Sequence, residues 1–125
     1  MSSKKIMIVE DDINTYEMYS LKFKKEWFEV LVSTNWLDAL TKLVDFKPDV
    51  ILLDIMMPSM DGFETLTAIK QLTTTINAKI IICSNLNDKK NIVRWFEIWA
   101  DDYLVKANVT PNEIYERVKK LLKMN

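Results

Sequence analysis

Five short apolar runs alternate along this chain with longer segments whose apolar residues recur every three or four positions. Four of the runs are almost continuous in Ile, Val, Leu and Met, which is typical of strands covered on both faces. The run at 29–33 is shorter and is flanked by polar residues, which favours an edge strand. The alternation predicts a parallel sheet with helices on both faces, joined by right-handed crossovers. The expected strands are 5–9, 29–33, 49–54, 79–84 and 102–106.

The segments between and after these runs are predicted to be helices. The last of them opens with Thr110 and Pro111, a favourable capping residue followed by a proline in the first turn. The predicted bounds are 13–26, 37–46, 62–72, 88–98 and 112–123. The apolar residues expected to share one face in the first two helices are Tyr16, Tyr19, Leu21 and Phe23, and then Leu37, Leu40, Leu43 and Val44.

Length and composition indicate one globular domain over residues 1–125. Of the 125 residues, 49% are apolar and 28% are charged, and the net charge of −1 gives no general attraction to nucleic acid or membrane. Cys83 is the single cysteine, so an internal disulfide is excluded. Because no segment has the length of a signal peptide or a membrane span, we expect a cytoplasmic protein. The absence of histidine excludes Ser-His and Cys-His catalysis, and a single glycine excludes a Gly-rich phosphate loop.

Polar residues follow four of the apolar runs at the point where each run ends. An acidic triplet begins at Glu10, and Asp54, Ser84 and Lys106 end or follow the third, fourth and fifth runs. The carboxyl ends of neighbouring parallel strands meet at one edge of a sheet, where ligands bind in folds of this kind. Crowded carboxylates repel one another unless a cation lies among them, and a lysine beside them can hold an anion. The pattern therefore indicates phosphate chemistry.

Four phrases of the sequence carry a family resemblance. They are IVEDD at 8–12, PDVILLDIMMP at 48–58, MDGFE at 60–64 and ADDYLVK at 100–106. In this order and at these spacings they closely resemble the receiver domain of two-component response regulators, over essentially the whole chain. The resemblance implies a doubly wound α/β fold with five parallel strands, the flavodoxin-like (βα)5 type, with strand order 2-1-3-4-5.

The resemblance also implies a role for each residue at the predicted site. Asp54 resembles the carboxylate that accepts a phosphoryl group, and Lys106 resembles the ammonium that contacts the phosphoryl oxygens. Ser84 and Tyr103 resemble the hydroxyl and the aromatic ring that turn toward the site after transfer. The implied ligands of Mg²⁺ are Glu10, Asp11, Asp54 and the backbone carbonyl of Met56. Oxygen ligands suit Mg²⁺ far better than zinc.

The implied function is that of a phosphorylation-controlled signalling switch rather than an enzyme. The donor would be a histidine kinase or a phosphotransfer protein. We expect a stand-alone receiver, because the last predicted helix ends near the end of the chain. Output would then pass to a downstream protein, or to a homodimer, through the face formed by the fourth helix, the fifth strand and the fifth helix.

Two readings from other functional classes stay open. One is a docking module that keeps the receiver fold but signals without phosphate, although Glu10, Asp11, Asp54 and Lys106 are all present. The other is a Mg²⁺-dependent phosphatase, which would need a general acid near the nucleophile, where this chain has Met56. For Tyr103, half-buried packing is as good an explanation as switching.

Two positions beside the predicted site depart from the usual receiver sequence. The residue after Ser84 is commonly small, and here it is Asn85, which we expect to change the lifetime of a phosphorylated state. The residue after Lys106 is commonly proline, often in a cis peptide, and here it is Ala107. A cis bond before alanine costs about 3 kcal/mol, so we expect a trans peptide here.

Tryptophans occupy positions where receivers commonly carry glycine. These are Trp27, Trp36 and Trp99, and Trp95 is a further candidate. Glycine at helix ends often supplies a left-handed residue, which tryptophan adopts with strain of roughly 1 kcal/mol. We hypothesise that UGA codons were translated with the wrong genetic code. The alternative is that these are genuine tryptophans that cover apolar surface.

Overall fold

The computed structural model describes residues 3–54, 67–68, 70–72, 77–85 and 100–124. The strands are β1 (Lys5–Val9), β2 (Glu29–Ser33), β3 (Val50–Leu53), β4 (Lys79–Ser84) and β5 (Asp102–Val105). The helices are α1 (Ile13–Lys25), α2 (Trp36–Phe46), the short 3-10 helix η1 (Lys106–Asn108) and α5 (Pro111–Leu121).

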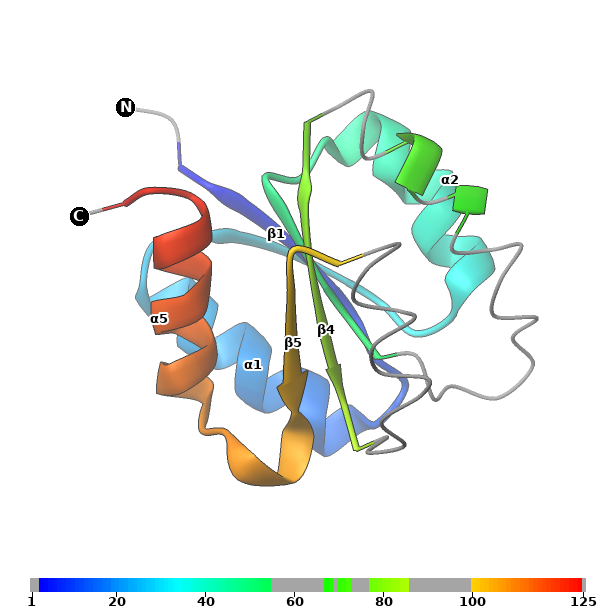
Figure 1. The fold of residues 1–125 in the computed structure, drawn as a ribbon. Helices are drawn as coiled ribbons and strands as arrows, with labels where there is room; N and C mark the ends of the chain where they lie inside the picture. Colours follow the sequence, from blue (N-terminus) through cyan, green and yellow to red (C-terminus); the bar gives the residue numbers. More distant parts are fainter. Residues whose placement is uncertain (1–2, 55–66, 69, 73–76, 86–99, 125) are drawn as a thin grey trace.

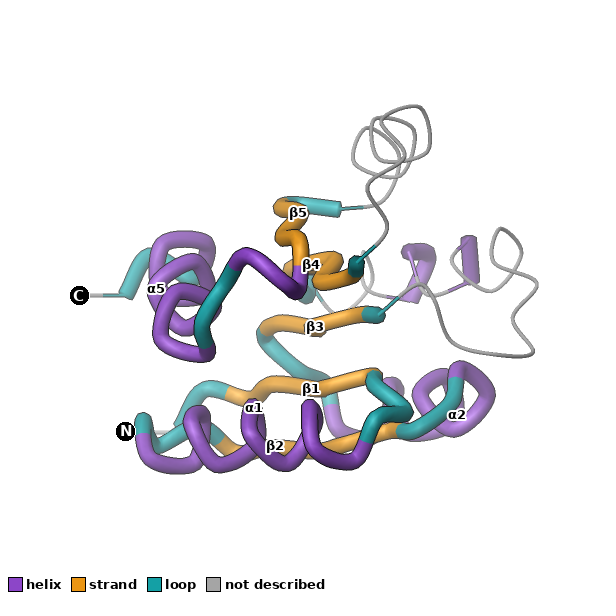
Figure 2. Tube along the Cα trace, turned by 90° about the horizontal axis from the view of Figure 1, so that it is seen from below, coloured by secondary structure: helices purple, strands orange, loops and turns teal. Residues whose placement is uncertain are grey.

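The strands form one parallel sheet in the order β2-β1-β3-β4-β5, which confirms the predicted topology (Figure 1). Figure 2 shows the strands following one another in this order. β2 is an edge strand, as its short apolar run indicated. Since β1, β3 and β4 lie in the middle of the sheet, their carboxyl ends are adjacent, and this adjacency positions the candidate site.

Alternating side chains of the strands supply two apolar clusters, one on each face of the sheet. In Figure 1, α1 and α5 lie on one side of the sheet and α2 lies on the other. The cluster beneath α1 and α5 takes its strand residues from Ile6, Ile8, Val50, Leu52, Ile81, Cys83 and Leu104. The cluster beneath α2 takes its strand residues from Met7, Val9, Ile51, Leu53 and Ile80.

Helix α5 starts with the capping residues that the sequence predicts. The Thr110 hydroxyl accepts the backbone N–H of Glu113 at 3.1 Å, and the Glu113 carboxylate accepts the backbone N–H of Thr110 at 3.2 Å. Pro111 occupies the first turn, where its missing N–H costs no hydrogen bond. Ile114 and Val118 of this helix are fully buried, so the cap fixes the start of a helix whose inner face completes the core.

The buried face of α2 differs from the predicted one. Leu37 is 73% exposed and Val44 is 50% exposed, although the spacing placed both on the apolar face. The residues that α2 buries are Trp36, Ala39 and Leu43. The large indole at the first position of the helix enters the core, and Leu37 and Val44 lie off the face that it shares with Ala39 and Leu43. In α1 the prediction was wrong only for Leu21, which is 59% exposed.

Two strands end one residue earlier than predicted. β3 ends at Leu53 rather than at Asp54, and β5 ends at Val105, after which Lys106 begins η1. The predicted helix at 62–72 is helical at 67–68 and 70–72, which is the part of it that the structure describes. The predicted helix at 88–98 lies outside the described residues.

The tryptophans differ in their backbone conformation. Trp27 has a φ of 67° directly after the C-cap of α1, and its side chain is 85% exposed, so it occupies a site that favours glycine. Trp36 lies in the first turn of α2 and is buried, so the expectation of a left-handed residue is wrong there. Trp95 and Trp99 lie outside the described residues.

Among the helices that the structure describes, none combines the length and the apolar character that crossing a membrane requires.

Candidate functional site

The side chains that the sequence places at the site lie where strands end. Glu10, Asp54 and Lys106 come directly after β1, β3 and β5, and Ser84 is the last residue of β4. The backbone N–H of Asp54 still donates to the carbonyl of Val9 at 3.0 Å. The backbone around Asp54 is therefore held by the sheet, although the strand itself has ended.

Glu10 and Asp54 continue the alternation of their strands, and Lys106 joins them from the start of η1. Glu10, Asp54 and Lys106 each lie two residues beyond a strand residue of the cluster beneath α1 and α5. Those strand residues are Ile8, Leu52 and Leu104. The apolar pattern that builds the core thus also places Glu10 and Asp54 on one face at its edge.

The ammonium group of Lys106 bridges two carboxylates. Its Nζ lies 2.5 Å from Oε2 of Glu10 and 2.8 Å from Oδ2 of Asp54. The side chains of Glu10 and Asp54 are only 3% and 8% exposed, and that of Lys106 is 15% exposed. Buried charges of this kind are stable only when they are paired, and the lysine supplies one positive charge against two negative ones.

Burial and pairing have opposite effects on the ionisable groups of this cluster. Burial raises the pKa of Glu10, and the hydrogen bond from Lys106 offsets only part of this effect. For Lys106, burial favours a lower pKa, but the hydrogen bonds to Asp54 and Glu10 outweigh it and leave the pKa raised. Lys106 is therefore a cation at neutral pH, and it is held in that state by the acids it contacts.

The three consecutive acids after β1 have three different environments. Glu10 is buried, and its Oε1 accepts the backbone N–H of Asp12 at 3.1 Å. Asp11 is exposed. Asp12 is the N-cap of α1, and its Oδ2 accepts the backbone N–H of Thr15 at 2.9 Å. The hydrogen bond from the Thr15 hydroxyl, followed by this capping bond, lowers the pKa of Asp12.

The acids also form a candidate metal site. One carboxylate oxygen from each of Glu10, Asp11 and Asp54 lies within 4.8 Å of the others. An all-oxygen set of ligands fits a hard divalent cation such as Mg²⁺ or Ca²⁺ rather than zinc or copper. Met56, whose carbonyl was predicted as a further ligand, lies outside the described residues.

Ser84 and Tyr103, the two predicted switch residues, differ in burial. Ser84 is fully buried at the end of β4, and Tyr103 is half-buried in β5. Burial raises the pKa of the Tyr103 phenol, with smaller contributions from Cys83 and Asp54. The two predicted switch residues are thus a buried hydroxyl at the end of β4 and a half-buried ring in β5.

A buried contact beneath the cluster was not predicted from the sequence. The hydroxyl of Tyr19 in α1 lies 3.7 Å from Sγ of Cys83 in β4. Burial raises the pKa of the Cys83 thiol to about 11. The apolar spacing of α1 placed Tyr19 in the core, but no sequence signal pairs it with a residue 64 positions away.

Asn85 and Ala107, the two positions that depart from the usual receiver sequence, are in direct contact. The side-chain Oδ1 of Asn85 accepts the backbone N–H of Ala107 at 2.9 Å. The Lys106–Ala107 peptide is trans, as predicted. The sequence marks both positions as unusual. Because they follow the ends of the predicted neighbouring strands β4 and β5, their proximity could have been predicted from the strand order.

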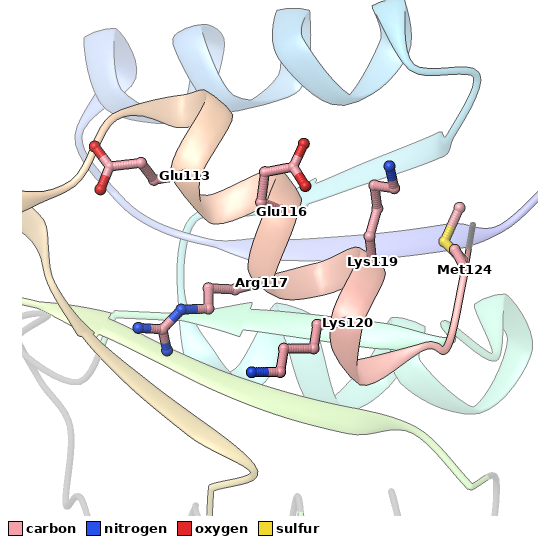
Figure 3. Close-up of a pocket in the computed structure, with 6 residues that line it drawn as sticks. All are labelled: Glu113, Glu116, Arg117, Lys119, Lys120 and Met124. Carbon is pink, nitrogen blue, oxygen red and sulfur yellow. The ribbon is translucent and has the colours of Figure 1, made fainter.

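A second feature, separate from the cluster of Glu10, Asp54 and Lys106, is an open cavity of about 570 Å³ on the outer surface of α5. Figure 3 shows the acidic side chains on the first half of the helix and the lysines on the second half. Arg117 also pairs with Asp102 at the start of β5, with Nη1 2.6 Å from Oδ2. The lining residues are Glu113, Glu116, Arg117, Lys119, Lys120 and Met124. The cavity therefore belongs to the surface of α5 and not to the acidic cluster.

Comparison with known proteins gives consistent matches. The family model of the response regulator receiver domain matches residues 6–119. The phosphate regulon transcriptional regulatory protein PhoB of Pseudomonas aeruginosa is 33% identical over 98% of this chain and 53% of its own length. The DNA-binding response regulator MtrA of Mycobacterium tuberculosis is 30% identical over 98% of this chain and 52% of its own length. The chain thus spans about half the length of these curated relatives.

Solved structures agree with the sequence comparison. A CheY-like response regulator receiver domain protein from Methanospirillum hungatei superposes with a TM-score of 0.85 at 27% identity, covering 98% of this chain and 95% of that one. A response regulator receiver domain from Francisella superposes with a TM-score of 0.84 at 29% identity, covering 97% and 98% of the two chains. The strand order, the acids and lysine at the strand ends, and these matches lead to one conclusion: the chain belongs to the response regulator receiver domain family of two-component signalling.

Proposed function

We propose that this receiver domain is a phosphoacceptor switch, in which Asp54 accepts a phosphoryl group from a histidine kinase or a phosphotransfer protein in a Mg²⁺-dependent reaction. The observation that carries the proposal is the Lys106 ammonium held between the carboxylates of Glu10 and Asp54, with Asp11 beside them. A nucleophilic carboxylate, a fixed cation and a candidate metal site are the groups that phosphoryl transfer to an acid requires.

Mg²⁺ would be held by Glu10, Asp11, Asp54 and the backbone carbonyl of Met56. When bound, it would offset the repulsion between the Asp54 carboxylate and the negatively charged phosphoryl group. The set of three carboxylates supports this assignment, because two of them are buried and one positive charge from Lys106 does not balance them. Asp11 is the exposed member, so ions in solvent can reach the cluster there.

In the transfer step, an oxygen of the Asp54 carboxylate forms a bond to phosphorus. The bond between phosphorus and the histidine nitrogen of the donor breaks, and its electron pair leaves with the imidazole. Lys106 contacts Asp54 before the reaction, so its charge is in place when negative charge accumulates on the phosphoryl oxygens. No large movement of the lysine is needed.

The switch would follow from the hydrogen-bonding needs of the new phosphoryl group. The Ser84 hydroxyl, at the end of β4, would donate to a phosphoryl oxygen, a charge-assisted bond that is stronger than a neutral one. Tyr103 is half-buried in β5, so part of its ring is exposed before any switch. Movement of Ser84 toward Asp54 would make room for the ring to turn inward, which changes the surface of β5.

The surface that responds would include β5 and α5. The ion pair of Arg117 with Asp102 joins these two elements, and α5 presents acids and lysines on its outer face (Figure 3). We expect a downstream protein, or a second copy of this domain, to bind to this surface. The predicted fourth helix at 88–98, which lies outside the described residues, would form the rest of the same binding face. The net charge of −1 favours a protein partner over nucleic acid.

The proposal is tested by incubating the protein with acetyl phosphate or phosphoramidate and Mg²⁺ and measuring its intact mass. We expect one phosphoryl adduct that forms only with Mg²⁺ and is lost in Asp54→Ala. Asp12→Asn is the matched control, because Asp12 adjoins the cluster but caps α1, and asparagine caps a helix equally well. Absence of an adduct would support a docking module, and rapid turnover of external phosphate esters would support a phosphatase.

A further inference from the structure

The side chain of Asn85 reaches from the end of β4 to the turn that carries Lys106. Its Oδ1 accepts the backbone N–H of Ala107 at 2.9 Å. β4 and β5 are paired with Ser84 opposite Val105, so Asn85 and Lys106 are the first residues beyond the ends of these two strands. The hydrogen bond therefore ties the two chains together immediately beyond the last pair of the strand ladder.

This bond supplies a cap that η1 lacks from its own sequence. The first N–H groups of a helical turn have no partner within the turn and need an oxygen from outside it. Val105 is the N-cap of η1, and no side-chain hydrogen bond caps the turn from that position, because its side chain is aliphatic. Asn85 provides the oxygen from another strand. Ala107 has an N–H to donate because it is not proline.

The capped turn begins with Lys106 itself. The ammonium group is largely buried, and it contacts Glu10 at 2.5 Å and Asp54 at 2.8 Å. The place of a side chain that reaches into a buried cluster depends on where its backbone starts, and small displacements of a positioned group can slow a reaction greatly. Holding the N–H of Ala107 fixes the peptide that directly follows Lys106.

We propose that Asn85 is a positioning residue for Lys106: it caps η1 through the N–H of Ala107 and so holds the ammonium group against Glu10 and Asp54. The effect on phosphorylation rests on the proposed function of Asp54, whereas the effect on the place of the ammonium group does not. Asn85 acts through the lysine and not by shielding the phosphoryl group.

Two variants of Asn85 separate these two roles. Asn85→Leu keeps a side chain of similar size but removes the hydrogen-bond acceptor, and Asn85→Ala removes both. We expect both to slow phosphorylation by acetyl phosphate about fivefold, the effect of losing one neutral hydrogen bond. If Asn85 acted as a steric shield, Asn85→Leu would behave as the wild type and Asn85→Ala would not, which would overturn the proposal.

A Lys106→Met background tests whether the effect passes through the lysine. In that background, Asn85→Leu is expected to cause no further loss of phosphorylation rate. A further fivefold loss in the double variant would show that Asn85 acts independently of Lys106, and it would overturn the proposal.

An NMR measurement tests the position of the Lys106 ammonium group without requiring phosphorylation. The buried, doubly paired ammonium of Lys106 is expected to give a ¹H–¹⁵N signal that exchanges slowly with water, and both Asn85 variants are expected to broaden or lose it. Circular dichroism confirms that the variants are folded. A wild-type spectrum without this signal, or an Asn85 variant that keeps it, would contradict the inference. A wild-type protein that forms no adduct would contradict only the proposed function.

Discussion

The ammonium nitrogen of Lys106 lies 2.8 Å from the carboxylate of Asp54. It therefore neutralises part of the negative charge that would attract a divalent cation to the same carboxylate. The same lysine is a candidate partner for the phosphoryl group. Its positive charge favours an anion at Asp54 and disfavours a second cation there. Lys106 thus has opposite effects on the two ligands that the proposed reaction brings together.

Removing this charge is expected to strengthen Mg²⁺ binding. Two unit charges about 4 Å apart interact by about 4 kcal/mol at an effective dielectric constant of 20, and relaxation will reduce this value. We expect Lys106→Met to bind Mg²⁺ about tenfold more tightly than the wild type, measured by titration calorimetry, while its phosphorylation by acetyl phosphate slows. Unchanged or weaker Mg²⁺ binding would show that the lysine does not compete for these carboxylates.

Replacing Trp27 by glycine is expected to stabilise the fold. Trp27 has a φ of 67° and is 85% exposed, so its side chain adds backbone strain with little burial in return. Trp27→Gly should raise the free energy of unfolding by about 1 kcal/mol, which corresponds to roughly 4 °C in the melting temperature. Trp27→Ala is the control, because alanine keeps the Cβ that disfavours this conformation. Equal stability of the two variants would exclude backbone strain as the cause.

The same substitution at Trp36 is expected to have the opposite effect. Trp36 is 4% exposed and packs with Ala39 and Leu43 beneath α2. Trp36→Gly should lower the free energy of unfolding by at least about 3 kcal/mol, because it leaves a cavity. Trp36→Phe should cost far less, since the indole Nε1 has no hydrogen-bond partner in the described part of the chain. Urea denaturation measures both, and a neutral Trp36→Gly would show that the indole is not part of the core.

The codons at these positions provide a separate check. UGA at the position of Trp27 or Trp36 in the source DNA would support translation with the wrong code, and UGG would refute it. The opposite stability effects expected for the two residues mean that glycine at Trp27 alone would improve the fold, whereas glycine at Trp36 would require the core to repack.

Cys83 is expected to react very slowly with thiol reagents in the native state. Its side chain is buried, and its pKa is raised to about 11, so only about 0.1% would be ionised at pH 8. Because the pKa is raised, native labelling should accelerate as the pH increases from 8 to 10. We expect the rate at pH 8 to be at least about a hundredfold below that of the urea-unfolded protein. Comparable rates would show that the β4 region opens readily.

Much of the fold could be predicted from the sequence because the sheet is buried on both faces. The runs of β1, β3 and β4 are too apolar to lie at a surface, and their ends could only meet at one edge. The meeting of Glu10, Asp54 and Lys106 follows from this topology. Their chemical roles, in contrast, remain predictions until an adduct and its variants are measured.

Other features depend on how one segment packs against the rest of the molecule and could not be predicted. Trp36 is buried while Leu37 and Val44 of the same helix are exposed, and helical spacing alone does not show which of these residues enter the core. The bond of Asn85 to Ala107 joins the residue that follows β4 to η1, 22 residues further along the chain. Each of these outcomes depends on the relative position of two segments, whereas the sequence pattern describes one segment at a time.

The turn from Glu10 to Asp12 has a length that cannot change without loss. Glu10 contacts Lys106 in the buried cluster, and two residues later Asp12 caps α1. An inserted or deleted residue in this turn would move either the acid out of the cluster or the cap out of reach of the Thr15 N–H. Substitutions can therefore accumulate on the exposed face of α1. In contrast, inserting or deleting one residue just before the helix would disrupt both the charge cluster and the helix cap.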